Sequence, residues 1–239
     1  MIEPAGGYIA VIDYGMSNLF SVMQACAGVG LKAVITSDPR VLSNAAGAIL
    51  PGVGAFGYAM TELEARGLVS GIKSFIAQGK PLMGICLGMQ LLLDSSDEFG
   101  ASRGLGIVRG AVRRFPGVDA AGQKVRIPHV GWSRVFLPEG KTGVDPILNG
   151  IPDRGYMYFV HSYYVQTQEN VSILQSVYGG AAFCSALRKG AVTAFQFHPE
   201  KSAGMGLRIY RNFKDEIVKG GLHGREEGRD QAVQSSAGG

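Results

Sequence analysis

One run of ten residues says most about how this chain folds: Pro81-Leu82-Met83-Gly84-Ile85-Cys86-Leu87-Gly88-Met89-Gln90. Its first half is a short apolar run typical of a buried strand, and residues 87–93 continue at helical spacing. Cys86 therefore stands at a sharp turn from strand to helix, with Gly84 and Gly88 two residues away on either side. This pattern fits a nucleophile elbow, which presents its central residue above the carboxyl ends of a parallel sheet.

The residues around this turn suit a reactive thiol. Glycine at 84 and 88 leaves out the Cβ atoms that would collide in a tight turn, because an elbow nucleophile has a strained backbone. The helix after Cys86 turns its first amide groups and its positive dipole end toward the sulfur, which favours the thiolate and provides donors for an oxyanion. Taken alone, the pattern fits an ordinary buried cysteine as well as a nucleophile. Cys26 and Cys184 lack such a turn and are expected to be buried and unreactive.

Strand and helix patterns alternate on both sides of the elbow. Strands are expected at residues 8–13, 31–36, 47–50 and 81–85. Helices are expected at residues 18–29 and 58–78, the second interrupted by Gly67 and Gly71. Because parallel neighbours need crossover helices, this alternation predicts an α/β domain around a central, mostly parallel sheet flanked by helices.

The second half of the chain has a different texture. After Gly100, short apolar or alternating runs separated by turns predict strands at residues 106–114, 124–132, 157–165, 173–177 and 191–197. Their hairpin-like connections predict an added antiparallel portion. A last helix is expected at 205–218, so that a single domain spans residues 8–218. Residues 220–239 contain few apolar side chains, bury too little surface to offset their ordering entropy, and are expected to be disordered.

Composition excludes several classes of function. The chain has 239 residues, 46% of them apolar, which is enough for one compact domain with its own core. Its net charge of +4 is spread without a run of five or more Lys and Arg, so neither nucleic acid nor a membrane surface is an expected partner. The chain has no signal-like start or span-length apolar run, and its three cysteines match no zinc or disulfide pattern. A reducing, cytoplasmic compartment is expected.

A thiolate nucleophile needs a base, and the base needs a group that orients it. His198 follows the apolar run Phe195-Gln196-Phe197, and Pro199 stiffens the link to Glu200, whose carboxylate can hold the imidazole tautomer. A triad of Cys86, His198 and Glu200 is the resulting hypothesis. Of the other histidines, His129 and His161 are expected to be structural or to lie beside a substrate, and His223 falls in the polar tail. Their scattered spacing does not predict a metal site.

The loop Pro51-Gly52-Val53-Gly54 follows a buried strand and is the second candidate element of the site. Its glycines allow peptide orientations that other residues resist, so its amides can form an anion nest or half of an oxyanion hole. It is not a phosphate-binding loop of the P-loop type, because no Gly-Lys-Ser/Thr follows.

Two motifs resemble those of the class I, triad-type glutamine amidotransferases: G-I-C-L-G-M-Q at residues 84–90 and F-Q-F-H-P-E-K-S at residues 195–202. Further matches, at residues 13–18, 50–56, 128–132 and 158–163, resemble the branch of that family that serves histidine biosynthesis. The resemblance covers roughly residues 8–218. It implies the flavodoxin-like fold of the family, with its mostly parallel sheet, and a glutaminase that needs no metal or organic cofactor.

The resemblance also implies a role for each matching residue. Cys86 would attack the glutamine carboxamide, His198 would pass a proton to the departing ammonia, and Glu200 would orient His198. The residues implied to hold the oxyanion through backbone amides are Leu87 and Val53 or Gly54, after a peptide rearrangement in the loop. The residues implied to bind glutamine are Gly52, Gln90, Glu98, Ser162 and Tyr163. For Glu98, the neighbouring Asp97 is an alternative acid.

Members of that branch work with a separate (β/α)8-barrel cyclase, so the resemblance implies a heterodimer in which ammonia passes to the barrel. The residues implied to face it are Asn18, Pro128, His129, Trp132 and Lys201. For Trp132, a place in the core is the alternative. Relatives that supply ammonia for sugar amidation in surface-polysaccharide synthesis keep the same chemistry and are a close rival. Two more distant hypotheses are a stand-alone cysteine hydrolase and a catalytically silent interaction subunit.

Overall fold

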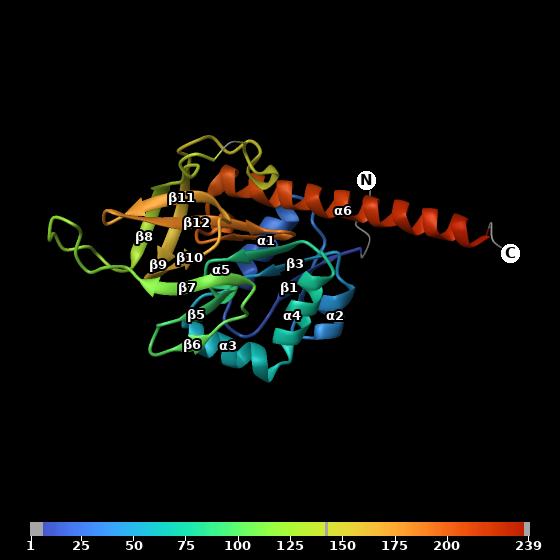
Figure 1. Ribbon diagram of the computed structural model, residues 1–239, viewed down its shortest axis with the longest axis horizontal. Helices are drawn as coiled ribbons and strands as arrows, with labels where there is room; N and C mark the ends of the chain where they lie inside the picture. The colour runs from blue at the N-terminus through green and yellow to red at the C-terminus, as the bar shows by residue number, and fades with distance from the viewer. Residues whose placement is uncertain (1–6, 142, 237–239) are drawn as a thin grey trace.

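The computed structural model describes residues 7–141 and 143–236, with side chains as far as residue 219. Its centre is a seven-stranded sheet (Figure 1). The order of strands across it is β11 (Ser172–Tyr178), β12 (Ala181–Lys189), β13 (Val192–Phe195), β4 (Leu82–Ile85), β3 (Gly47–Leu50), β1 (Ile9–Ile12) and β2 (Ala33–Thr36).

Five neighbouring strands of this sheet, from β13 through β4, β3 and β1 to β2, are parallel. β12 and β11 continue the sheet antiparallel at one edge. Parallel strands share a carboxyl edge, so the segments that follow Ile12, Leu50, Ile85 and Phe195 all meet there. In open α/β sheets this edge is where ligands bind.

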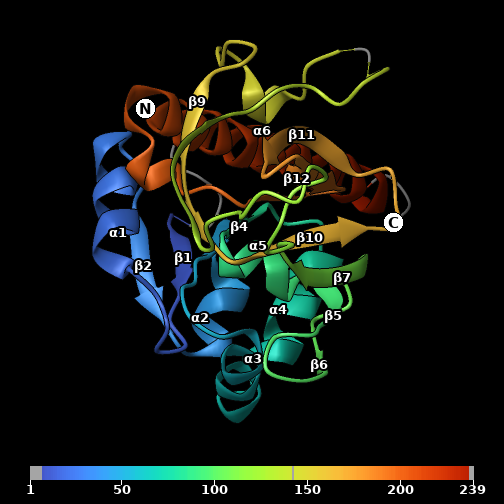
Figure 2. The ribbon, with the colours of Figure 1, turned by 90° about the vertical axis from the view of Figure 1, so that its left-hand side faces the viewer.

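Helices cover both faces of the sheet, because successive strand residues point to opposite sides. Ile12 and Leu50 belong to one core, and Val11 and Ile49 to the other. The helices of the first core are α2 (Pro39–Asn44), α3 (Phe56–Ala65) and α4 (Leu68–Ala77). Those of the second are α1 (Leu19–Gly28) and α6 (Ala203–Ser236). Figures 1 and 2 both place α6 above the sheet and α3 below it.

Two smaller sheets lie beside the carboxyl edge. A four-stranded sheet has the order β10 (Tyr163–Thr167), β7 (Val108–Arg114), β5 (Leu93–Ser96) and β6 (Ser102–Arg103). An antiparallel ribbon consists of β8 (His129–Arg134) and β9 (Tyr156–His161). The remaining short elements are α5 (Leu87–Leu91), η1 (Pro146–Leu148) and η2 (Pro199–Lys201). The predicted fold class, a mostly parallel sheet with an antiparallel portion, is confirmed.

Several predicted boundaries are wrong in detail. The helix expected at 58–78 is two helices, and only Gly67 divides them, because it has a left-handed φ of 66° while Gly71 lies inside α4. The strand expected at 157–165 breaks at Ser162 and enters two different sheets. The strand expected at 124–132 starts only at His129. Periodicity does not show where a chain changes its partner strand, which is why these boundaries escaped prediction.

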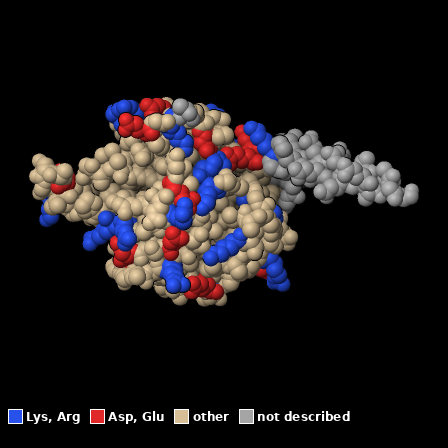
Figure 3. All heavy atoms as spheres, in the orientation of Figure 1, with Lys and Arg blue, Asp and Glu red and all other residues tan. Residues whose placement is uncertain are grey.

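Helix α6 is longer than predicted, and Ile217 is the last buried residue among its side chains described, which reach residue 219. The side chains of residues 220–239 lie outside the described part of the chain, and so does His223, so the expected disorder of this segment and its separation from the domain 8–218 stay predictions. No helix in the described ranges is long and apolar enough to cross a membrane. On the face shown in Figure 3, basic and acidic side chains are interspersed.

Candidate active site

Cys86 lies between β4 and α5, with a φ of 53° and a ψ of −107°. A positive φ is rare and strained in a residue other than glycine, as expected for an elbow nucleophile. The two flanking glycines make the turn possible: a Cβ on Gly88 would lie 1.8 Å from the carbonyl oxygen of Leu50, and one on Gly84 would lie 3.1 Å from the carbonyl oxygen of Gly88. The Cys86 amide donates to the carbonyl of Phe195 at 2.7 Å, which ties the elbow to β13.

His198 and Glu200 form a buried pair beside Cys86. The imidazole Nδ1 donates to the Glu200 carboxylate at 2.7 Å, and both side chains are almost completely buried. This bond fixes the tautomer, so Nε2, which has no other partner, is the nitrogen left for Cys86. Burial alone would lower the pKa of His198, but the nearby Cys86 thiolate and the Glu200 carboxylate raise it to about 10. The raised pKa of His198 means that a positively charged imidazole faces the Cys86 sulfur.

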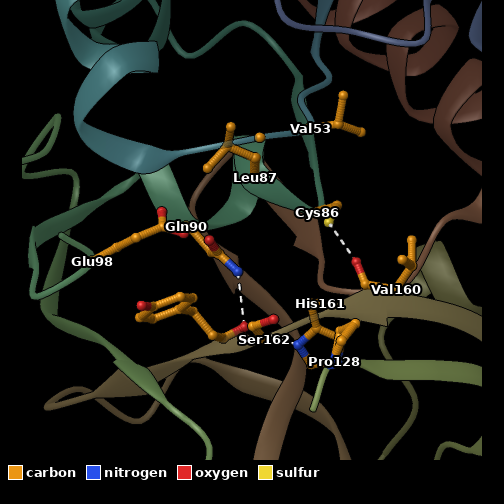
Figure 4. Close-up of a pocket in the computed structure, with 11 residues that line it drawn as sticks. Val53, Cys86, Leu87, Gln90, Glu98, Pro128, Val160, His161 and Ser162 are labelled. Atoms are coloured by element: carbon orange, nitrogen blue, oxygen red, sulfur yellow. Dashed lines mark hydrogen bonds between the residues drawn. The ribbon is translucent and has the colours of Figure 1, made fainter.

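A pocket of about 260 Å³ opens above the Cys86 sulfur (Figure 4). The thiol donates to the carbonyl of Val160 at 3.8 Å across this pocket. The residues that line it are Val53, Gly54, Cys86, Leu87, Gln90, Glu98, Pro128, Val160, His161, Ser162 and Tyr163. Among the described side chains, no three His, Cys, Asp or Glu residues gather so as to hold a metal ion.

Two of the three amides expected to serve an oxyanion hole, those of Leu87 and Val53, are engaged by carbonyl groups. The Leu87 amide donates to the carbonyl of Gly52 at 3.4 Å, and the Val53 amide donates to the carbonyl of Met16 at 2.9 Å. The Gly52 carbonyl and the Val53 amide belong to the same peptide unit, so one peptide orientation occupies both donors. A Cβ at Gly52 would lie 2.0 Å from the Tyr14 hydroxyl, which explains why glycine stands there.

This geometry, a buried cysteine, histidine and carboxylate at the carboxyl edge of a parallel sheet, accompanies a match over most of the chain. A model of the class I glutamine amidotransferase family matches residues 10–217. The chain belongs to the class I glutamine amidotransferases. The predicted family resemblance and the predicted class of enzyme are thereby confirmed.

Curated relatives of this amidotransferase carry a more specific name. The imidazole glycerol phosphate synthase subunit HisH of Geobacillus sp. (strain WCH70) is 43% identical over 212 residues, which cover 89% of this chain and 98% of that protein. HisH of Geobacter sulfurreducens is 44% identical over 206 residues, which cover 86% of this chain and 97% of that protein. A chain in the structure of PurLQS from Thermotoga maritima shares the fold, with a TM-score of 0.66 at 18% identity over 90% of this chain and 100% of that one.

Most residues expected to bind glutamine in this amidotransferase line the pocket. Gln90 is buried and donates through Nε2 to the carbonyl of Tyr163 at 2.9 Å (Figure 4). Glu98 also lines the pocket, whereas its neighbour Asp97 is paired with Arg113 at 3.0 Å and does not. Burial raises the pKa of Glu98, although the amide of Phe56 donates to its carboxylate at 2.6 Å. The geometry therefore favours Glu98 over Asp97.

The residues expected to face a partner are divided between surface and core. The side chain of His129 is only 2% exposed and donates through Nδ1 to His161, so it has no surface to offer a partner. Trp132 is 50% exposed, which contradicts the alternative of a core tryptophan. Asn18 caps α1, and its side chain and that of Lys201 are exposed. Pro128 is exposed and lies at the rim of the pocket.

Two contacts to the Cys86 side chain were not predicted from the sequence. One is the Val160 carbonyl, a backbone group whose position no sequence pattern predicts. The other is Gln196, whose amide nitrogen lies 3.7 Å from the Cys86 sulfur in a fully buried position. A polar residue between two buried phenylalanines in an apolar strand end was a signal that could have revealed it.

Proposed function

We propose that this chain is the glutaminase subunit of an imidazole glycerol phosphate synthase and passes ammonia to a separate (β/α)8-barrel cyclase in histidine biosynthesis. The observation that carries the chemistry is the buried His198–Glu200 pair beside the strained Cys86. The pathway rests on relatives named HisH, which this chain matches over nearly their whole length.

The proposed reaction uses the three residues in turn. The Cys86 thiolate attacks the carboxamide carbon of glutamine, and the carbon–nitrogen bond breaks as His198 Nε2 gives its proton to the departing ammonia. A glutamyl thioester remains on the sulfur. His198 then takes a proton from water as the water adds to the thioester, and glutamate leaves while the thiolate is restored. Glu200 holds the imidazole through Nδ1 in both steps.

We propose that the partner switches this site on through the peptide between Gly52 and Val53. In the orientation seen here, the carbonyl of this peptide accepts from the Leu87 amide, and its own amide, that of Val53, donates to the carbonyl of Met16. A flip of this one peptide would free the first donor and turn the second toward the pocket. Because a single oxyanion donor is worth about 10²–10³ in rate, the engaged state predicts a low activity of the isolated subunit.

The outward side of the β8–β9 ribbon supports a partner interface there. Val130, Trp132 and Tyr156 are each about half exposed, an unusual density of large apolar side chains on a surface. In Figure 3 the left part of the molecule, over β8 and β11, carries few charges. Release of ammonia beside such a covered surface would also keep it from becoming ammonium, which is not nucleophilic.

The test measures glutamate release from glutamine by the purified protein, alone and with the histidine-pathway barrel cyclase of the same organism and its nucleotide ligand. Stimulation by at least about 100-fold is expected from recovery of an oxyanion donor. No stimulation, in a protein whose Cys86 reacts with a glutamine-like affinity label, would keep the amidotransferase and favour the sugar-amidating rival. Turnover of peptides or esters without any partner would favour the stand-alone hydrolase.

Replacement of the nucleophile separates the two halves of the proposed reaction. Cys86→Ala is expected to abolish the use of glutamine while leaving ammonia-driven synthesis by the complex intact, because the barrel carries the ring chemistry. Product formation from glutamine and from ammonium salt would be compared in the same complex. Loss of both activities in a folded complex would contradict this division of labour.

A further inference from the structure

Gln196 is a buried amide in direct contact with the nucleophile. It follows β13, is 0% exposed, and its backbone amide donates to the carbonyl of Ser185 at 2.9 Å. Its side-chain Nε2 donates to the Cys86 sulfur at 3.7 Å, and its Oε1 accepts from Gln90 Nε2 at 3.1 Å. Both ends of this amide are therefore used inside the site.

The chemistry of the neighbours fixes which way this amide points. Gln90 Nε2 faces the carbonyl of Tyr163, which can only accept a hydrogen bond, so the nitrogen of Gln90 belongs there. The same nitrogen faces Gln196, so the atom of Gln196 toward it is the oxygen. Gln196 therefore presents its N–H to the sulfur, with no freedom to exchange its two ends.

The Tyr163 carbonyl, at the end of this row of hydrogen bonds, is itself held in place by further side chains. His161 is buried and burial lowers its pKa to about 3, so it is neutral, and its Nδ1–H donates to the Tyr163 carbonyl at 2.8 Å. Its Nε2 must then accept from His129 Nδ1 at 3.0 Å, and His129 Nε2 accepts from the Ser133 hydroxyl at 2.8 Å. Every donor in this row has an acceptor, so the carbonyl has a fixed position.

We propose that Gln196 is a polar partner of the nucleophile, which donates to the Cys86 thiolate and, through its oxygen, keeps Gln90 turned so that the Gln90 oxygen faces the pocket. This inference rests on the proposed glutaminase chemistry and deepens it. A hydrogen bond donated to a charged group favours the charged form, so the Gln196 N–H adds to the effect of His198. The orientation of Gln90 decides whether the pocket offers an acceptor or a donor to glutamine.

Two variants separate the two roles. Gln196→Glu keeps an acceptor for Gln90 but replaces the donor at the sulfur with an acceptor. Gln196→Met removes both groups at similar volume. Because one hydrogen bond to a charged group is worth roughly tenfold or more, both variants are expected to slow alkylation of Cys86 by iodoacetamide about tenfold at pH 7. The KM for glutamine is expected to rise about tenfold in Gln196→Met and to stay within about twofold of the parent in Gln196→Glu.

The measurement follows the alkylation rate from pH 5 to 9, glutaminase kinetics and the thermal midpoint. The control is Thr193→Val in β13, which removes a buried hydroxyl that has no partner. Cys86→Ala gives the background from the other two thiols. The control is expected to change the thermal midpoint without changing alkylation, whereas in the Gln196 variants the pH of half-maximal alkylation moves upward.

The outcomes distinguish a failure of the proposed role of Gln196 from a failure of the proposed glutaminase chemistry of Cys86. If the parent protein is alkylated no faster than Cys86→Ala, the proposed nucleophile is wrong. If the parent reacts quickly and folded Gln196→Glu reacts equally fast over the whole pH range, Gln196 is not a donor to the thiolate. If Gln196→Met has the parent KM, Gln196 does not orient Gln90.

Discussion

The positive φ of Cys86 is held by its neighbours against its own conformational preference. Gly88 lies directly against Leu50 of β3, so the helix after Cys86 begins in contact with the neighbouring strand. This close approach is what turns the chain sharply and leaves Cys86 in the lining of the pocket. A strained residue of this kind persists only where the surrounding structure over-determines it.

Gly88→Ala tests this explanation at the scale of one atom. The added Cβ would lie 1.8 Å from the carbonyl oxygen of Leu50, so β3 and α5 must separate. A loss of at least about 3 kcal/mol in the free energy of unfolding is expected from urea denaturation. The matched control is Gly204→Ala in α6, where no atom lies within 4 Å, and it is expected to be neutral or stabilising by about 0.5 kcal/mol. Equal effects at the two positions would contradict the explanation.

At the scale of elements, the β8–β9 ribbon connects an exposed face to the pocket. Its outer face carries Val130 and Trp132, whereas its inner face carries His129, stacked on Tyr178 with ring centroids 3.9 Å apart. His129 and His161 form the cross-strand pair at the end of the ribbon. The ribbon is therefore fixed to the active site by neutral imidazoles in an aromatic surrounding.

We expect this pair to make the ribbon sensitive to acid. Burial lowers the pKa of His129 to about 4 and that of His161 to about 3, below the 6.5 of an unfolded histidine. The unfolded chain therefore binds protons first, so this stability is complete above pH 6.5 and is lost as the pH falls toward 4 and 3. As the pH falls from 6.5 to 5, each buried histidine is expected to lower the free energy of unfolding by about 2 kcal/mol.

The measurement is the free energy of unfolding in urea at several pH values from 7 to 5. His129→Phe, which keeps a ring in the stack, is expected to reduce the slope of stability against pH, even where its absolute stability is lower. An unchanged slope would show that the pair is not the source of the acid sensitivity.

At the scale of the whole molecule, the last helix closes one face of the central sheet. Ile209, Tyr210, Phe213 and Ile217 are the buried apolar residues of α6, and they pack with α1 and the sheet. Asn212 also donates to the carbonyl groups of Ile147 and Asn149, which joins α6 to η1. Among the side chains that the structure describes, the last one of α6 to enter the core is thus that of Ile217.

Truncation tests where the domain ends. A chain that stops after residue 220 is expected to keep the glutaminase activity of the full chain and its thermal midpoint within about 2 °C, because all four core residues of α6 remain. A chain that stops after residue 208 loses these residues and is expected not to fold. Thermal unfolding and glutamate release check both. A large loss of activity or thermal midpoint in the chain that stops after residue 220 would show that residues 221–239 contribute to the domain.

Local patterns in the chain were sufficient for the fold class and for the turn at Cys86. Hydrophobic periodicity predicts the alternation of strands and helices, and Gly84, Cys86 and Gly88 predict the elbow, because these signals lie within a few residues of one another. The spacing of His198 and Glu200 is equally local, and their 2.7 Å bond follows from one short turn. These features need no knowledge of which strands are neighbours.

Contacts between segments that are distant in the sequence could be identified only in the tertiary structure. Gln196 and Cys86 are 110 residues apart, and they meet because β13 pairs with β4. The orientation of the Gly52–Val53 peptide depends on Met16, which follows another strand, and the burial of His129 depends on β9 and Tyr178. Strand order is settled by the packing of the whole core, and a local period carries no record of it. The turn that presents Cys86 could therefore be predicted from the sequence, whereas the distant groups that contact and surround Cys86 could not.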